Sequence, residues 1–211
     1  MEKSYKYLGY FLILLIPLTF AGFYKTYFSQ FHHFGENIDI YVHLHGFIAS
    51  VWILMLITQP LLIANKKFKL HRTIGKLSYL VFPLLIMSFI PRIIRMSQAE
   101  DSRIIFYPLA DCVLLILFYS LAIYNKKSTT KHMRFMIACA IVFLGPTVGR
   151  IGPHLLGWSD ILTQSVQYAI IFFILCSLIF YDKKNARKFD PYIVASAGFF
   201  IHMTVFYLIF L

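Results

Sequence analysis

Apolar runs of about 20 residues, separated by short basic clusters, fill almost the whole of this sequence. A run of that length is what an α-helix needs to cross the hydrocarbon core of a bilayer. The chain has 211 residues, of which 59% are hydrophobic and only 14% are charged, so it has no room for a separate soluble domain. The sequence therefore predicts an all-α integral membrane bundle that forms a single domain over residues 1–211.

The pattern of apolar runs predicts seven transmembrane helices. Their approximate bounds are residues 7–24, 40–64, 73–95, 103–124, 132–154, 161–181 and 191–211. The first run is longer than the apolar core of a signal peptide, and no clear small-residue cleavage site follows it. We therefore expect the first run to be retained as a helix.

Lysine and arginine gather in alternate connections between these helices. Fifteen of the 20 lie in one set: Lys3, Lys6, Lys66, Lys67, Lys69, Arg72, Lys76, Lys126, Lys127, Lys131, Arg134, Lys183, Lys184, Arg187 and Lys188. The other set holds Lys25, Arg92, Arg95, Arg103 and Arg150, together with the acidic residues Glu36, Asp39, Glu100, Asp101 and Asp160. The positive-inside rule then predicts a cytoplasmic N-terminus and an external C-terminus, in the inner membrane of a bacterium.

The formal net charge of +11 does not indicate a nucleic-acid partner, because the basic residues form no single face with interleaved aromatic side chains. Membrane topology alone explains where they lie, so the expected partner is the lipid bilayer. Cys112, Cys139 and Cys176 all fall inside apolar runs without paired spacing. We expect them to be small core residues rather than disulfide or zinc ligands.

The second predicted helix carries a stripe of unusual residues. His45, Trp52 and Gln59 are spaced seven apart, so on a helix they share one face. Polar groups inside hydrocarbon are costly unless they are paired or functional. The stripe is therefore predicted to face another helix or a site.

The polar residues of the predicted helices separate into two layers when depth is counted at about 1.5 Å per residue. His71 and His132 begin helices at the inner rim. Asp111 is the only acidic residue inside any predicted span, so it is expected to be protonated or to pair with a cation such as Arg92, Arg150 or a histidine. The outer layer consists of His43, His45, Asp111, Arg150, His154 and His202.

Three functions fit these layers, and the first is a histidine-liganded redox protein that binds haem b. His71 and His132 would be the inner ligands, and His45 with His202 the outer ones. Asp111 and Arg150 would be the catalytic residues that tune the site or relay protons. A quinone or another small molecule would be the reaction partner.

The second function is an intramembrane enzyme that depends on zinc or another transition metal. Its ligands would come from His43, His45, His202 and Asp111, although the two histidines of the pair point to different sides of a helix. The third is a small transporter or sensor without a cofactor, in which Asp111, Arg150 and the histidines form a proton or anion path.

Several motifs carry a resemblance that covers about residues 40 to 151. They are the HLHG stretch at 43–46, Trp52, Gln59, HRTIG at 71–75, PLAD at 108–111, KHMRFM at 131–136 and VGR at 148–150. Together they resemble a group of uncharacterised bacterial multispanning membrane proteins. The HRxxG element is also similar to one in membrane haem b proteins of the ferric-reductase and cytochrome b561 type. That similarity implies haem as the cofactor.

Overall fold

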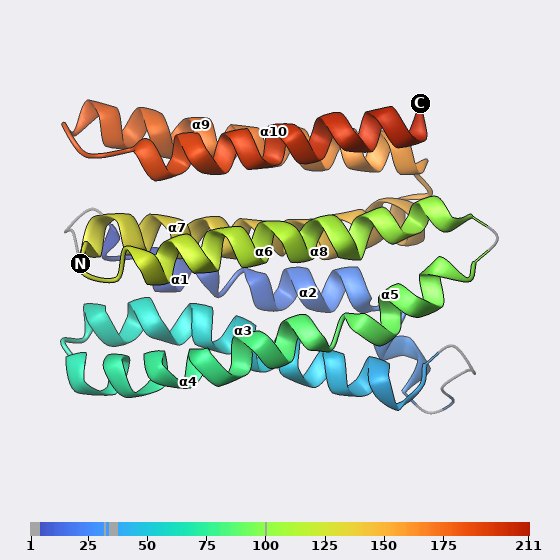
Figure 1. Cartoon of the computed structure of the whole chain (residues 1–211), viewed down its shortest axis with the longest axis horizontal. Coiled ribbons are helices and arrows are strands. Elements are labelled where there is room, and N and C mark those ends of the chain that lie inside the picture. The colour runs from blue at the N-terminus through green and yellow to red at the C-terminus, as the bar shows by residue number, and fades with distance from the viewer. Residues whose placement is uncertain (1–4, 32, 34–37, 100) are drawn as a thin grey trace. The chain divides into compact units, whose positions relative to one another are not determined.

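The computed structural model describes residues 5–31, 33, 38–99 and 101–211, and its regular elements are all helical (Figure 1). Lys3, Glu36 and Glu100, which the topology prediction uses, lie outside these residues. The first compact unit, Met1–Ser102, contains α1 Leu8–Leu12, α2 Leu15–Phe23, α3 Ile40–Ala64, α4 Phe68–Met87 and α5 Ile90–Ser97. The second unit, Arg103–Leu211, contains α6 Phe106–Tyr124, α7 Thr129–Val142, α8 Leu144–Ile151, a π-helical turn Gly152–Leu156, α9 Asp160–Lys184 and α10 Asp190–Phe210.

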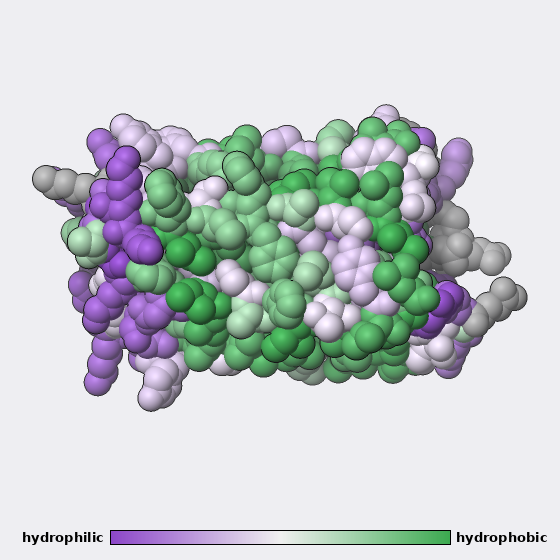
Figure 2. Space-filling view, turned by 90° about the horizontal axis from the view of Figure 1, so that it is seen from above, coloured by the Kyte–Doolittle hydropathy of each residue, from purple (hydrophilic) through white to green (hydrophobic). Residues whose placement is uncertain are grey.

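Six helical segments in the described part of the chain are long and apolar enough to cross a membrane. They are Ile40–Ala64, Phe68–Ser97, Ser102–Tyr124, Thr129–Leu156, Asp160–Lys184 and Asp190–Phe210. On the face drawn in Figure 2, hydrophilic residues gather near the helix ends and hydrophobic residues cover the middle. These features are those of an all-α integral membrane protein that spans the bilayer several times, as the sequence predicts.

The first predicted span is an apolar helical stretch, Leu8–Phe23, which is shorter than the other six. It is broken between α1 and α2, four residues before Pro17. Proline has no N–H and its ring clashes with the carbonyl of the residue four positions earlier. The same spacing relates the end of α4 at Met87 to Pro91, and the end of α7 at Val142 to Pro146.

In the first unit, the predicted stripe on α3 faces α4. His45 Nδ1 lies 2.8 Å from Ser88 Oγ, at the end of α4. Trp52 is 1% exposed and its ring centroid lies 5.2 Å from that of Phe82. The amide oxygen of Gln59 lies near Gly75, where a Cβ would be 3.9 Å away. The prediction of one shared face is therefore confirmed, and that face holds α3 against α4.

In the second unit, α6 and α7 form an antiparallel hairpin, and α10 packs against α6, α7 and α9 (Figure 1). Helix α8 packs against α9. An aromatic cluster of Phe106, Tyr168 and Phe206 fills the space between α6, α9 and α10. These contacts bring side chains from four helices to the end of the unit where α6 and α9 begin.

Two predictions about charged residues are corrected here. Asp111 is not the only buried acidic residue, because α9 extends to Lys184 and buries Asp182 completely. Arg134, which the sequence assigns to a basic connection, is likewise fully buried. Its Nε donates a hydrogen bond of 2.6 Å to Asp182 Oδ2. Of the cysteines, Cys112 and Cys139 are buried as predicted, whereas Cys176 is exposed on α9.

Candidate functional site

Three of the predicted site residues come together in the second unit. Asp111 lies in α6, Arg150 in α8 and His202 in α10. Their separation in the sequence is large, so only the packing of the four-helix unit could bring them together. His43, His45 and His71 belong to the first unit, and His132 lies at the start of α7 in the second.

The centre of the site is an acid–base pair inside the helices. His202 Nε2 lies 3.7 Å from Asp111 Oδ1, and the two side chains are 6% and 16% exposed. This distance is longer than a hydrogen bond, and among the described residues Nε2 has no hydrogen-bond partner. The ring of Phe106, with its centroid 4.9 Å from that of His202, covers the imidazole. The pair is thus enclosed by other side chains, but no hydrogen bond joins His202 Nε2 to Asp111.

Tyr168 orients the imidazole from its other side. Its hydroxyl lies 2.8 Å from His202 Nδ1, and the tyrosine is 2% exposed. Tyr168 was not among the residues predicted from the sequence. The feature that indicates it is the spacing of Gln164, Gln167 and Tyr168, which places three polar groups on one face of an apolar helix.

Helix α8 closes the site next to Asp111. The guanidinium of Arg150 is near enough for a favourable electrostatic interaction with the Asp111 carboxylate, and it also donates a 2.8 Å hydrogen bond to the carbonyl of Pro146. Gly145 packs directly against the carboxylate, since a Cβ at this position would lie 3.0 Å from both Oδ1 and Oδ2. Any side chain here would displace Asp111, so glycine is required by this close approach.

The helix between Arg150 and His154, which the sequence analysis places together in the outer layer, is not a regular α-helix. The two residues are four apart, which would align them on a regular α-helix. The π-helical turn Gly152–Leu156 interrupts that helix, and His154 is exposed. Pro153, which opens the turn, removes the N–H that would continue the helix. The four-residue spacing from Arg150 therefore does not place His154 beside the Asp111–His202 pair.

Buried polar groups of α9 lead from its first turn to the pair. Thr163, Gln164 and Gln167 are 1%, 5% and 3% exposed. Within the described parts of the chain, Thr163 Oγ1 and the amide oxygens of both glutamines have no hydrogen-bond partner. The glutamines lie against Gly149 of α8. Burying such oxygens is costly unless a further partner such as water satisfies them.

The two histidines of the HLHG stretch have separate partners in the first unit. His43 Nδ1 lies 2.7 Å from the hydroxyl of Tyr27, whereas His45 Nδ1 lies 2.8 Å from Ser88 Oγ. Ser88 Oγ also lies 2.6 Å from the carbonyl oxygen of Leu85, to which it can donate. The single hydroxyl proton can point to that carbonyl or to His45 Nδ1, so either group can be the donor between Ser88 and His45.

His132 also forms a hydrogen bond through Nδ1, in the second unit. Its Nδ1 lies 2.9 Å from the carbonyl oxygen of Ala122, which can only accept, so Nδ1 carries the proton. His71 is half-buried in the first turn of α4. Since His71 and His132 belong to different units, their pairing stays a prediction. Over residues 5–31, 33, 38–99 and 101–211, no three His, Cys, Asp or Glu side chains gather as a metal site would require.

Comparisons with known proteins add no assignment to this geometry. Known protein families, characterised proteins and solved structures were each searched with the chain, and none matched. The proposals below therefore rest on the residues of this chain alone.

Proposed function

We propose that the chain is a small membrane transporter that handles protons at the Asp111–His202 pair. The observation that supports this most is the geometry of that pair, with His202 Nε2 3.7 Å from Asp111 Oδ1 and His202 Nδ1 2.8 Å from the Tyr168 hydroxyl. Ionisable side chains are rare inside membrane helices and mark proton relays when they face the interior of a bundle.

The pair can hold one proton in either of two places. With the proton on Asp111 both side chains are neutral, and with the proton on His202 they form a carboxylate and an imidazolium. The Tyr168 hydroxyl suits both states, because it accepts from Nδ1–H in the neutral imidazole whose Nε2 is unprotonated and also in the imidazolium. Transfer therefore requires no loss of the tyrosine hydrogen bond. Burial disfavours the ionised form of Asp111, and the positive charge of Arg150 offsets part of that effect.

Access for protons would follow α9. Thr163 lies in the first turn of this helix, and Gln164 and Gln167 lie between that turn and Tyr168. Their buried oxygens would accept hydrogen bonds from water molecules, which conduct protons along a chain of such bonds. This face of α9 gives the pair a polar connection to one end of the helix.

Proton flux into reconstituted vesicles tests the proposal. Purified protein is reconstituted with a pH-sensitive dye inside, and a potassium diffusion potential drives protons inward. Wild-type protein is expected to acidify the lumen faster than empty vesicles do, and Asp111→Asn to lower that rate by about 100-fold. Asp190→Asn is the matched control, because Asp190 is an exposed partner of Lys131. Wild-type flux equal to that of empty vesicles would refute the proposal.

Haem b is a second candidate, favoured by the hydrogen bond of His132. Its Nδ1–H donates to the carbonyl of Ala122, so a neutral His132 directs the Nε2 lone pair away from this anchor. Ligating histidines are usually oriented in this way. His71 and His132 would hold an inner haem and His45 an outer one, whereas the Nε2 of His202 faces Asp111 and suits the relay better. A bound haem would supply electron transfer.

An absorbance spectrum separates the two candidates. A Soret band that shifts on dithionite reduction, and that weakens in His132→Ala, would support haem; a colourless preparation would exclude it. Elemental analysis for zinc, iron and copper on the same sample tests the metal alternative, for which only His202 and Asp111 come together in one unit.

The seven-helix topology belongs to this proposal as well. Its support is the charge distribution, with fifteen of 20 basic residues in one set of connections. In the inner membrane of a bacterium, seven spans with a cytoplasmic N-terminus give an external C-terminus. Alkaline phosphatase fused after Leu211 should then be active, and a cytoplasmic fluorescent protein at the same position should be dark. Six spans with the same cytoplasmic N-terminus would reverse both results.

A further inference from the structure

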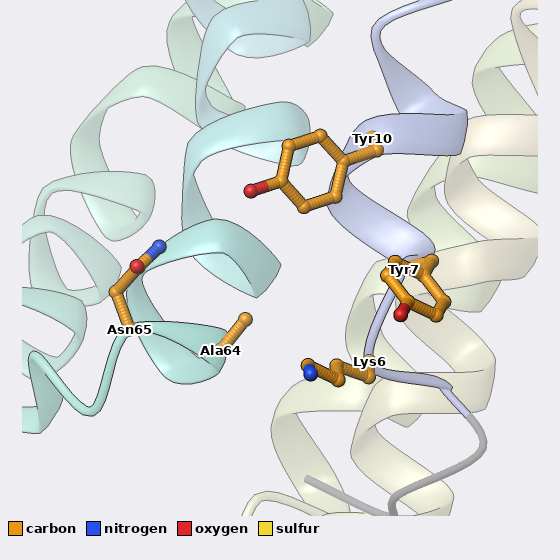
Figure 3. A pocket seen from close by; sticks show the side chains of 5 residues that line it. All are labelled: Lys6, Tyr7, Tyr10, Ala64 and Asn65. Carbon is orange, nitrogen blue, oxygen red and sulfur yellow. The ribbon is translucent and has the colours of Figure 1, made fainter.

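A pocket in the first unit lies apart from all the histidines. It is formed between the start of the chain at Lys6, Tyr7 and Tyr10 and the C-terminal end of α3 at Ala64 and Asn65 (Figure 3). Its volume of about 360 Å³ is within the range of small-molecule sites. The close approach of α1 to α3 is fixed next to it by Gly9, where a Cβ would lie 2.6 Å from the side chain of Leu61.

The groups that line this pocket suit an anion. Figure 3 shows the Lys6 side chain extending toward the end of α3 and the Tyr10 hydroxyl pointing into the same gap. The ammonium of Lys6 lies 5.6 Å from the centroid of the Tyr7 ring, a cation–π contact that limits where it can move. None of the described residues that line the pocket is acidic. Ammonium and hydroxyl groups together favour a phosphate.

The position of the pocket favours a lipid as the source of that phosphate. The exposed lysines Lys66 and Lys67 follow directly after Asn65, so the pocket lies where apolar helices meet a basic turn. Phe11 and Leu14, which follow Tyr10 along the chain, are 61% and 57% exposed, and tyrosine is enriched at membrane interfaces. A phospholipid can use both surfaces at once, with its headgroup at the cation and its acyl chains on the apolar side chains.

We propose that this pocket binds the phosphate of an anionic phospholipid, with Lys6 as the charged contact and Tyr10 as a hydrogen-bond donor. Basic pockets between transmembrane helices at the cytoplasmic surface recognise anionic headgroups in this way. The site is independent of the proton relay, which lies in the other unit.

Native mass spectrometry of the full-length protein tests the proposal. The protein in detergent is titrated with phosphatidylglycerol, with phosphatidylcholine of the same acyl chains, and with inorganic phosphate. Phosphatidylglycerol is expected to bind most tightly, and Lys6→Gln to weaken it by about five-fold. Tyr10→Phe should weaken it by about two-fold, as the loss of one exposed hydrogen bond predicts. Lys69→Gln is the matched control, since Lys69 is exposed on α4 but does not line the pocket.

Each alternative result overturns the assignment. Equal binding of the two lipids would mean that the pocket recognises acyl chains rather than charge. Displacement of phosphatidylglycerol by inorganic phosphate would identify a free anion as the ligand. An equal effect of Lys6→Gln and Lys69→Gln would mean that the surface attracts anionic lipid without a specific site.

Discussion

The second unit contains two buried acid–base pairs that differ in how completely they are satisfied. Arg134 and Asp182 are both 0% exposed and joined by a 2.6 Å hydrogen bond. The guanidinium also donates to the carbonyl of Thr130 at 3.1 Å and lies over the ring of Tyr192. Asp111 and His202 are 3.7 Å apart, and Nε2 of His202 makes no hydrogen bond to the described residues.

The difference in hydrogen bonding suggests different roles for the two pairs, one structural and one functional. A pair at hydrogen-bond distance, with further partners on both sides, loses much by any change of state, so it holds helices together. A pair that is not hydrogen-bonded is held less firmly in one protonation state, and it can exchange a proton when its two groups approach or when one water molecule bridges them. We therefore interpret Arg134–Asp182 as a clamp between α7 and α9, and Asp111–His202 as the working site.

The largest effect is expected when the clamp loses one partner. Arg134→Leu leaves the Asp182 carboxylate buried without its cation, which should cost about 3–5 kcal/mol of unfolding free energy. Unfolding in detergent, followed by tryptophan fluorescence, measures this loss. The double variant Arg134→Leu/Asp182→Leu should recover most of it, because no charge is then left uncompensated. Lys131→Gln, which removes an exposed ion pair to Asp190, should cost less than about 1 kcal/mol.

Substitution of His202 should lower the proton flux strongly and the stability only slightly. His202→Phe removes the group that exchanges the proton, so the vesicle flux should fall by about 100-fold. Its unfolding temperature should fall far less than that of Arg134→Leu, since the new ring keeps the contact with Phe106 and only the hydrogen bond to Tyr168 is lost. A variant that unfolds as easily as Arg134→Leu would show that His202 is structural, and the contrast between the two pairs would fail.

A smaller effect is expected from filling the space beside the carboxylate. Gly145→Ala puts a Cβ 3.0 Å from both oxygens of Asp111, so the carboxylate must shift away from its present position. We expect about a ten-fold loss of flux and a destabilisation of about 1–3 kcal/mol, as overpacking usually causes. Gly46→Ala is the matched control, because a Cβ there would meet nothing within 4 Å.

Removing the Tyr168 hydroxyl should have a milder effect. Tyr168→Phe takes away the group that bonds His202 Nδ1 at 2.8 Å but keeps the ring in the aromatic cluster. The loss of one buried hydrogen bond is worth about 1 kcal/mol, which corresponds to a flux about five-fold lower. Unchanged flux would mean that the hydroxyl only fills space.

The smallest effect is expected along α9. Gln167→Leu removes one polar oxygen of the proposed access route, and water can still use Thr163 and Gln164, so flux should fall by about two-fold. Stability should increase by about 1 kcal/mol, since an unsatisfied buried oxygen is replaced by an apolar group. Ala169→Leu, on the exposed side of the same helix, is the control and should leave the flux unchanged.

The helices and several residues of the working site were predictable from the sequence because charged side chains and histidines are rare in apolar runs. Asp111, Arg150 and His202 were identified because each interrupts hydrocarbon-compatible sequence. Their meeting in one unit could not be derived, since it depends on how α6, α8 and α10 pack.

The Arg134–Asp182 pair was not predicted because both residues lie near the ends of their helices. Arg134 was counted with the basic connections although the predicted span 132–154 includes it, and Asp182 follows the predicted span 161–181. In the structure both residues lie within helices and are buried against each other. Tyr168, Gln164 and Gln167 were not predicted for a different reason. Single tyrosines and glutamines are common in membrane helices, and only the shared helix face of these three residues distinguishes them.

The break between α7 and α8 has a mechanical consequence for the two pairs. Arg134 lies on α7, whereas Gly145 and Arg150, which both adjoin Asp111, lie on α8. Because Pro146 interrupts the helix at Phe143, a tilt of α8 about that residue would move the surroundings of Asp111 while α7 stays clamped to α9. The same interruption therefore gives the end of the unit that holds Asp111 a pivot and leaves the end that holds Arg134 as the fixed support.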